Sequence, residues 1–600
     1  MSLIAGAVRF DGAPVDAEIL EGLAAHLSRS PDDQVKRFPL DFPANANVSP
    51  MRGSGFHIEH GVLDGNATVE TSSFLVLGAG EPFFRHTPDE VEPRDVDFDR
   101  IGKAGANDAQ ALDELLVTSR GTFQAAVIAK NEARVELVGD LFGVRTLYLW
   151  SDGTTFVFAS RLGCLEAIDA LSKPIDRLGL HEQVAFVGSL DEHTPYATIR
   201  MLRGGERLTL SNQGCRSTRY FSWDRVSDED MSSDERVTLI YERFHEAVAR
   251  RLSGDKSVMA FLSGGLDSRM IVSVLRERGV DVHALNYAWE GSHERIVADR
   301  FARVSGAIPH MILRPRLNDR SYPAHASRTA FDSEYVFDPA PDHRTRVWAG
   351  DGGSVICGYV HTSDETIAAL RAGDAGEAAR AFTRMKPFRL PEAVLAQGER
   401  TDLTGFAIRR IAEALTAGGR ALTEKSLYHF QIENQERRHL VRYFEELDLV
   451  RIEMPLPFFD ADFARCFIST PIELGMYHRL YIEWMKRLPS FVFEVPWQAY
   501  DRHIASDLPM PEGERQWGAL AAEHVQERRR RAVAEYEAGR ELRRDVGLSF
   551  PKELLSRARL TAALAATKLG RGDYDYLVRT AGLYERFWAI SGGRIAERSV

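Results

Sequence analysis

A turn rich in glycine and hydroxyl side chains follows a short apolar strand near the middle of this 600-residue chain. Residues 258–271 read Val-Met-Ala-Phe-Leu-Ser-Gly-Gly-Leu-Asp-Ser-Arg-Met-Ile. Two adjacent glycines let backbone N–H groups approach a phosphate closely, and the helix that follows points its positive dipole end at the same anion. Two serine hydroxyls add donors, and the aspartate is an oxygen ligand suited to Mg²⁺. The run predicts a nucleotide-phosphate site made of Leu262, Ser263, Gly264, Gly265, Leu266, Asp267 and Ser268.

The spacing of this turn excludes a Walker-type loop, which requires Gly-x-x-x-x-Gly-Lys-Ser/Thr. A glycine turn without a ligand is the alternative interpretation. The matched positions and their strand, turn and helix setting favour the phosphate site. The run resembles the SGGxDS pyrophosphate-binding loop of enzymes that cleave ATP between the α and β phosphates.

Alternating strands and helices surround the turn. We expect helices at 236–252, 268–278 and 292–305, and a second strand at 280–287. This order predicts a parallel sheet with right-handed crossovers. Ligands bind at the carboxyl ends of such strands, which is where the turn would lie.

The chain before about Asp224 has a different, β-rich pattern with frequent turns. Strands are expected at 121–128, 134–138, 146–150, 155–159 and 206–210. The acidic, serine-rich residues 227–235 predict a linker that also caps the next helix. From about Ser363 the pattern is mostly helical, with long amphipathic helices between 507 and 547.

Composition bounds the class of protein. With 44% hydrophobic and 27% charged residues the chain is typical of globular proteins, and its length suggests two or more domains. A net charge of −12 argues against a nucleic acid partner. No apolar run is long enough for membrane insertion and the N-terminus does not resemble a signal peptide, so we expect a cytoplasmic protein.

Four scattered cysteines favour neither disulfides nor zinc. The arginines at 528–531 are interpreted as a solvated helix face, with docking of an acidic peptide as the alternative.

Further motifs make the chain similar to the asparagine synthetase superfamily over most of its length. Residues 139–148 (Gly-Asp-Leu-Phe-Gly-Val-Arg-Thr-Leu-Tyr) resemble RDPFGxRPLYY, and residues 348–359 (Trp-Ala-Gly-Asp-Gly-Gly-Ser-Val-Ile-Cys-Gly-Tyr) resemble SGEGADELFGGY. Residues 158–160 resemble the FASE strand, 199–207 the IxxLPPGH turn and 452–460 LEVRVPFLD. The order and spacing of these segments strengthen the match.

The resemblance implies a fold for each part of the chain and the residue ranges of its domains. Residues 1–224 would form a glutaminase-like αββα sandwich of the N-terminal nucleophile type, and 225–235 a linker. Residues 236–490 would form an ATP-pyrophosphatase synthetase domain, with the parallel sheet of adenine nucleotide α-hydrolases. Residues 491–600 would be a helical extension.

The N-terminus departs from the family's glutamine-hydrolysing members. Those begin Met-Cys-Gly-Ile, and removal of Met leaves a cysteine nucleophile. Here Ser2 takes that place, and a hydroxyl is a far poorer nucleophile than a thiol. We find no counterpart of the family's Asn-Gly-Glu or Arg-Gly-Pro-Asp segments, so we interpret this domain as an inactive structural platform.

The resemblance also implies site residues in the second half. Asn286 and Tyr287 would hold the adenine and ribose, and Gly350, Gly352 and Gly353 would form a turn near the pyrophosphate. A separate set would carry chemistry: Asp267 and Asp351 as ligands of Mg²⁺, Asp351 with Glu453 as the group that accepts a proton, and Arg479 as the cation opposing an oxyanion, with Lys486 as its alternative. Ser354 replaces a metal-binding Asp of the family and Pro455 an Arg, and Asp460 is expected to cap a helix.

These features predict an ATP-dependent carbon–nitrogen ligase that adenylates a carboxylate, releases AMP and pyrophosphate, and couples the carboxylate to an amine. The cofactors implied are ATP and Mg²⁺. Members without the cysteine include β-lactam synthetases and lasso-peptide macrolactam cyclases. The long helical C-terminus favours a cyclase acting on a precursor peptide, with a leader-peptide protease as partner. The alternatives are an asparagine synthetase-like enzyme that uses ammonia or glutamine on a small carboxylate, and a non-catalytic scaffold.

Overall fold

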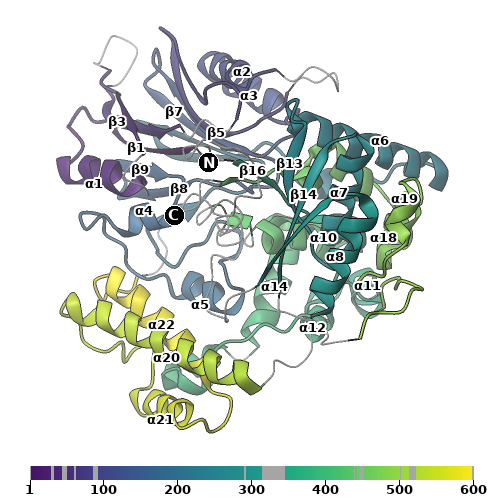
Figure 1. The fold of residues 1–600 in the computed structure, drawn as a ribbon. Coiled ribbons are helices and arrows are strands. Elements are labelled where there is room, and N and C mark those ends of the chain that lie inside the picture. The colour runs from purple at the N-terminus through teal and green to yellow at the C-terminus, as the bar shows by residue number, and fades with distance from the viewer. Residues whose placement is uncertain are drawn as a thin grey trace.

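Two antiparallel sheets packed face to face form the N-terminal part of the computed structural model (Figure 1). The structure describes residues 2–28, 33–42, 50–59, 63–84, 92–288, 292–313, 345–403, 405–437, 440–441, 444, 452–499, 502–512 and 522–596. The first sheet has the order β10(Ile199–Met201), β8(Tyr148–Ser151), β9(Thr155–Ala159), β1(Leu3–Arg9), β3(Arg52–Ile58), β2(Val35–Pro39). The second has the order β12(Gly214–Arg219), β11(Glu206–Ser211), β7(Arg134–Gly139), β6(Phe123–Ala129), β5(Phe74–Gly80), β4(Thr68–Glu70).

Apolar side chains from both sheets fill the space between them. Ile4 of β1 and Phe158 of β9 lie in one buried cluster with Leu77 of β5 and Ile128 of β6. Helices α1(Ala17–Leu27) and α4(Leu162–Glu166) cover the first sheet, and α2(Arg94–Asn107) and α3(Ala109–Leu116) lie on the side of the second. The predicted αββα sandwich and its expected strands are confirmed.

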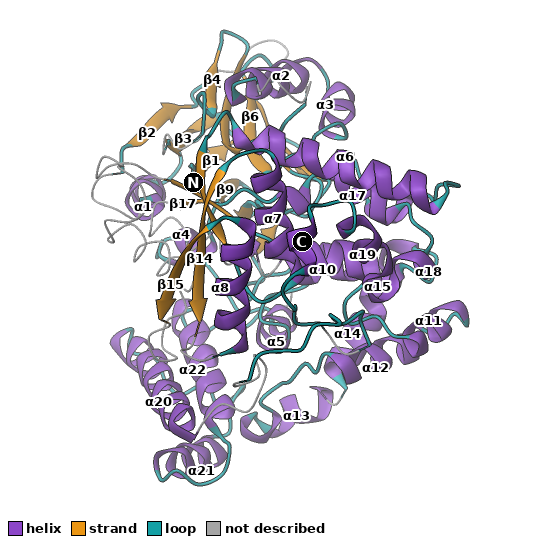
Figure 2. Ribbon diagram, turned by 45° about the vertical axis from the view of Figure 1, so that its right-hand side comes forward, coloured by secondary structure: helices purple, strands orange, loops and turns teal. Residues whose placement is uncertain are grey.

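A parallel sheet follows the linker, with the order β15(Ile308–Leu313), β14(Asp281–Ala288), β13(Ser257–Phe261), β16(Thr345–Trp348), β17(Ile452–Glu453). Helices α6(Ser233–Leu252), α7(Leu266–Glu277) and α8(His293–Ser305) lie beside it (Figure 2). Ser232 and Glu235 form a capping box at the start of α6, as the acidic segment predicts. The predicted parallel sheet is confirmed, and β13, which carries the glycine turn, is its central strand. The domain limits themselves stay a prediction.

Helices make up most of the remaining described chain. Their bounds are α5(Arg177–Ala185), α10(Gly353–Gly358), α11(Asp364–Arg371), α12(Ala375–Met385), α13(Gln397–Leu403), α14(Phe406–Thr416), α15(Ser426–Phe430), α17(Ala461–Ile468), α18(Ile472–Gly475), α19(Arg479–Met485), α20(Ala522–Asp545), α21(Arg557–Lys568) and α22(Asp575–Ile590). A π-helical segment, η4(Gln431–Glu436), continues α15. None of the helices in the described ranges has the length and apolarity required to span a membrane.

The C-terminal helices pack back onto the N-terminal part of the chain. Helices α20 and α22 lie side by side (Figure 1), and Ile175 pairs in parallel with Ile595 beyond the end of α22. Two of the four arginines at 528–531 make contacts across this unit. Arg528 pairs with Asp575 of α22 at 3.3 Å, and Arg529 donates to the carbonyl of Gly572. Both side chains are partly exposed, so this helix face is in contact with solvent and also contributes these two contacts.

Candidate active site

The glycine turn lies at the carboxyl end of β13 and leads directly into α7. Two serines fix its shape, because Ser268 Oγ accepts from the backbone N–H of Ser263 at 2.9 Å and Ser263 Oγ accepts from the N–H of Gly265 at 3.2 Å. The N-cap of α7 is Gly265, and no side chain of the described residues caps this helix end. The N–H groups of its first turn are therefore free to donate to an anion.

A second glycine turn, residues 349–353, follows the neighbouring strand β16 and packs against the first. A Cβ on Gly350 would lie 2.5 Å from the backbone nitrogen of Ser268, and one on Gly353 would lie 2.5 Å from Asp267 Cγ. Gly352 has φ +88°, a conformation that side-chain-bearing residues rarely adopt. Glycine is thus required at these positions for the two turns to touch, and this contact brings Asp351 to the Asp267 side of the site.

Asp267 accepts three hydrogen bonds at the junction of the turns. The N–H and Oγ of Ser354 donate to Oδ2 at 2.9 and 2.8 Å, and the hydroxyl of Tyr481 donates to Oδ1 at 3.0 Å. Burial raises the pKa of Asp267 to about 6, the three donors oppose that shift, and the charge of Asp351 adds to it. Ser354, where the family has an acid, here supports the remaining carboxylate as a hydrogen-bond donor.

The predicted nucleoside contacts lie on the next strand. The amide of Asn286, at 1% exposure, donates from Nδ2 to the carbonyl of Leu262 at 2.8 Å, so this side chain ties β14 to the start of the turn. The side chain of Tyr287 lies outside the described residues. Gln498, which lies in none of the sequence motifs, also reaches the turn: its backbone N–H donates to the carbonyl of Gly264 at 3.0 Å.

Glu453 is held by the N-terminal part of the chain. It lies on β17 and forms an ion pair with Arg145, and both side chains are 3% exposed. Burial alone would raise the pKa of Glu453, but the charge and hydrogen bond of Arg145 outweigh burial and hold the pKa below its ordinary value. The predicted coupling of Glu453 to Asp351 stays a prediction, and the structure adds Arg145 as a partner.

Arg479 begins α19 and lies at the surface. Its guanidinium donates to the carbonyl of Glu473 at 3.0 Å, so the structure does not bring it together with the two turns. The next cation candidate, Lys486, is exposed and pairs with Glu483. The role of a cation at the oxyanion therefore stays a prediction.

Two histidines that the sequence did not mark lie behind Ser354. His478, at 2% exposure, places Nε2 3.4 Å from Ser354 Oγ, and its Nδ1 contacts the ring of His503. Burial lowers the pKa of His478 to about 3, so the imidazole is neutral. These rings fill the space behind the second turn; Gly358 leaves room for His478, because a Cβ there would lie 2.3 Å from Nε2.

Ser2, at the position where the family's glutamine-hydrolysing members have cysteine, is hydrogen-bonded to another side chain of the protein. Ser2, at 3% exposure, donates from Oγ to Glu59 at 2.7 Å, and Arg94 pairs with the same carboxylate at 2.5 Å. Burial would raise the pKa of Glu59, but Arg94 and the donors at Ser2 and Ala67 bring it to about 2. A carboxylate with so low a pKa is a poor base for activating a hydroxyl.

The two predicted magnesium ligands are carboxylates, the type of side chain that binds Mg²⁺. Mg²⁺ is commonly bound through one or two carboxylates together with substrate phosphates and water, so Asp267 and Asp351 beside a phosphate turn suffice. Within the described ranges no three His, Cys, Asp or Glu side chains come together to hold a metal without such help. Asp460, by contrast, caps α17 through the N–H groups of Asp462 and Phe463, which confirms its predicted structural role.

Comparisons with known proteins match two separate segments of the chain. The family model for asparagine synthase matches residues 239–317, and the glutamine amidotransferase domain matches residues 109–221. An asparagine synthetase [glutamine-hydrolyzing] 3 of Bacillus subtilis is 28% identical over 190 residues, which are 30% of each chain. A putative asparagine synthetase of Methanocaldococcus jannaschii is 26% identical over 30% of this chain and 37% of its own. The chain thus spans about a third of the length of these relatives.

A shorter match is to an enzyme of another name. A 7-cyano-7-deazaguanine synthase of Hydrogenovibrio crunogenus is 32% identical over 65 residues, 10% of this chain and 28% of that one. Among solved structures, the allosteric regulatory enzyme of purine biosynthesis covers 52% of this chain and 80% of its own at 10% identity and a TM-score of 0.25. A similarity that low carries no argument about fold or function.

Proposed function

Because the chain is a member of the asparagine synthetase superfamily, we propose that it is a ligase that uses ATP to join a carboxylate to an amine, with AMP and pyrophosphate as the other products. One observation carries the proposal. The glycine turn at residues 263–268 lies at the carboxyl end of the central parallel strand, and the turn at 349–353 packs onto it with a second carboxylate.

The chemistry follows from the groups at that junction. An oxygen of the substrate carboxylate attacks the α phosphorus, the bond from that phosphorus to the bridging oxygen breaks, and pyrophosphate leaves. The N–H groups at the start of α7 and the hydroxyls of Ser263 and Ser268 bind the departing phosphates. Mg²⁺, held by Asp267 and Asp351, would supply positive charge to the same phosphates.

The second step makes the amide bond. The amine nitrogen attacks the acyl carbon, the bond from that carbon to the AMP oxygen breaks, and the nitrogen loses a proton. We assign that proton to the carboxylate of Asp351, which lies on the second turn. The pairing of Glu453 with Arg145 keeps another carboxylate ionised at the adjacent strand end.

We further propose that the amine comes from the substrate itself, as in a lasso-peptide macrolactam cyclase acting on a precursor peptide with a partner leader-peptide protease. Two observations support this. The hydroxyl of Ser2 donates to Glu59, an ion-paired carboxylate with a pKa of about 2, so this neighbour is a poor base for activating Ser2 towards glutamine. A large charged cavity next to the N-terminal sandwich offers space for a peptide.

The second candidate is an asparagine synthetase-like enzyme that uses ammonia or glutamine on a small carboxylate. The names of three relatives favour it, because each of these three is named as a glutamine-hydrolysing asparagine synthetase. A non-catalytic scaffold is the candidate from another class. Such a scaffold would bind ATP at the glycine turn but would not catalyse a reaction.

Nucleotide product analysis separates the three candidates. The full chain is incubated with ATP and Mg²⁺, and with either aspartate plus ammonium, aspartate plus glutamine, or peptides that contain Asp or Glu and a free α-amine. AMP and pyrophosphate formed only with peptides support the cyclase, and turnover with aspartate supports the second candidate. No AMP under any condition, from protein that binds ATP, contradicts the ligase. The Asp267→Asn variant is the negative control and Gly398→Ala, where a Cβ meets nothing within 4 Å, is the positive one.

A further inference from the structure

A cavity of about 790 Å³ lies between the N-terminal sandwich and the helices that follow the parallel sheet. One wall is formed by the segments on either side of β10 and by the end of β12 with the residues that follow it. The other is formed by α14, the glycine pair that follows it, and η4. The lining has five arginines and four carboxylates: Arg203, Arg219, Arg225, Arg410, Arg420, Asp191, Asp224, Glu413 and Glu433. Its volume is in the range of pockets that hold molecules larger than a single amino acid.

The arginines of one half of the cavity outnumber their partners. Glu433 accepts from Arg219 at 3.0 Å and from Arg420 at 2.9 Å, so one carboxylate serves two guanidinium groups. Arg225 is exposed and has no ion pair within the part of the chain that the structure describes. These three arginines face two acids, Glu433 and Asp224, which leaves one positive charge without a counterpart.

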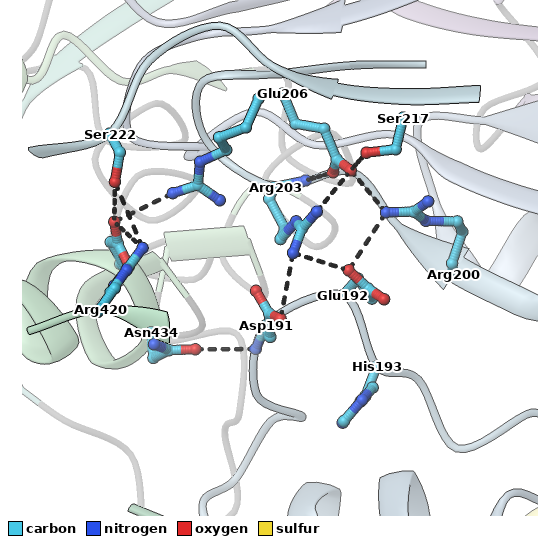
Figure 3. Close-up of polar contacts among 12 residues, drawn as sticks. Asp191, Glu192, His193, Arg200, Arg203, Glu206, Ser217, Ser222, Arg420 and Asn434 are labelled. Atoms are coloured by element: carbon cyan, nitrogen blue, oxygen red, sulfur yellow. Dashed lines mark hydrogen bonds and ion pairs between the residues drawn. The ribbon is translucent and has the colours of Figure 1, made fainter. Parts of the chain in front are cut away.

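In the other half of the cavity, Arg203 is held by several ion pairs and hydrogen bonds. Arg203 points at both Asp191 and Glu192, at 3.3 and 3.1 Å, and donates to Glu206 at 3.0 Å (Figure 3). The side-chain oxygen of Asn434 accepts from the backbone N–H of Asp191 at 2.8 Å. This hydrogen bond holds Asp191 in a left-handed backbone conformation, with φ +54°. These contacts restrain the side chain of Arg203, and the side chain of Asp191 remains 48% exposed.

The cavity lining carries both positive and negative side chains, which favours a peptide over a polyphosphate as its ligand. A polyphosphate would meet four carboxylates in the lining and no glycine turn at a helix start comparable to residues 263–268. A peptide, in contrast, carries carboxylates for the surplus arginines, and backbone amides that donate to acids such as Asp191 and Asp224. Apolar Leu178, Leu190 and Ala414 complete the lining and suit aliphatic side chains.

The wall of the cavity is also tied to the proposed active site. The π-helical segment η4 carries Glu433 and Asn434, and π-helical turns are rare and occur frequently at functional sites. On the same stretch of chain, Tyr428 donates to the carbonyl of Ile356 at 2.6 Å, and Ile356 lies on α10. Because α10 begins at the second glycine turn, this hydrogen bond connects the helix that precedes η4 with the turn that carries Asp351.

We propose that this cavity binds a short segment of a peptide substrate whose carboxylate side chains pair with Arg219 and Arg225. The inference rests on the proposed function, since it gives the ligase a second contact with its substrate, apart from the carboxylate that is adenylated.

The test is direct binding of tetraglutamate to the full chain by calorimetry at low salt, with tetraglutamine, tetralysine and free glutamate as comparison ligands. Arg225 makes no ion pair in the described chain, so Arg225→Ala is expected to fold normally. Loss of one charge-assisted contact should weaken tetraglutamate binding about tenfold, and Arg225→Glu should weaken it further. Arg384→Ala, an exposed arginine paired with Glu377 on α12, is the matched control and should bind as the unchanged protein does.

Three outcomes overturn the inference: no binding of tetraglutamate, equal binding of tetraglutamine, or equal affinities for the Arg225 and Arg384 variants. Binding of free glutamate as tight as that of tetraglutamate overturns the peptide assignment, because a small acid would then suffice. These readouts need no ATP, so they are distinguishable from a failure of the ligase, which would appear as absent AMP formation.

Discussion

Removal of the Ser354 hydroxyl should shift the pH at which the proposed ATP site becomes functional. Ser354 Oγ donates to Asp267 at 2.8 Å and so favours the ionised carboxylate. Burial raises the pKa of Asp267 to about 6, which means that the free enzyme gains the carboxylate as pH rises through that value. In Ser354→Ala the pKa should rise further, because one of three donors is lost.

The size of the shift follows from the energy of such a hydrogen bond. A hydrogen bond to a charged group contributes about 1.5–3 kcal/mol, and about 1.4 kcal/mol corresponds to one pKa unit. Since the N–H of residue 354 and the Tyr481 hydroxyl still donate, we expect the lower end, a rise of about one unit. At a pH of about 6.5 the ionised fraction of Asp267 would then fall from about three quarters to about one quarter.

The assay is the pH profile of kcat/KM for ATP, measured by pyrophosphate release, because this ratio reports ionisations of the free enzyme. The acid limb of Ser354→Ala should lie about one unit above that of the unchanged protein. Tyr481→Phe should move it in the same direction. Tyr428→Phe, which removes a hydroxyl that donates to the carbonyl of Ile356, is the control and should leave the limb in place. If the acid limb of the pH profile stays in place in both Ser354→Ala and Tyr481→Phe, the two hydroxyls do not lower the pKa of Asp267 and the reasoning is refuted.

Three further predictions concern other parts of the chain. Gly350→Ala should lower pyrophosphate release at least tenfold, since its Cβ would lie 2.5 Å from the Ser268 nitrogen, whereas Gly398→Ala should not; equal rates would contradict the packing of the two turns. Glu453→Gln should lower the free energy of unfolding by about 3 kcal/mol in a urea titration, because it leaves the Arg145 charge buried, and Arg145→Met with Glu453→Leu should recover part of that loss. Ser2→Ala should leave the rate of AMP formation unchanged and glutamine intact, and measurable glutamine hydrolysis that disappears in this variant would show that Ser2 is a nucleophile.

The fold could be predicted largely from local pattern. Short alternating strands before residue 224 and a strand, helix, strand, helix order after 255 each favour one arrangement, and the structure has both. The turn at 263–268 was identifiable because glycine, serine and aspartate are needed at fixed spacing in one continuous segment. Asp460 was identifiable as a cap for the same reason, since capping is a local interaction.

The parts that sequence could not supply are contacts between distant segments. Nothing near Glu453 in the sequence indicates that Arg145, 308 positions earlier, is its partner. Gln498 reaches the first turn and Tyr481 reaches Asp267 only because the chain returns there after long helical excursions. The arginines of the cavity come from four separate segments, and the basic run at 528–531, which was conspicuous in the sequence, is partly used in packing α20 against α22.

We propose that the two glycine turns form a site at which a carboxylate is adenylated. The decisive experiment uses a peptide that supports turnover and carries ¹⁸O in its carboxyl groups. Mass spectrometry of the nucleotide should find AMP containing one ¹⁸O atom, because the carboxylate oxygen that attacks the α phosphorus stays with AMP when the amine displaces it. ADP as the product, or ¹⁸O in inorganic phosphate, would show attack at the γ phosphorus and contradict the account.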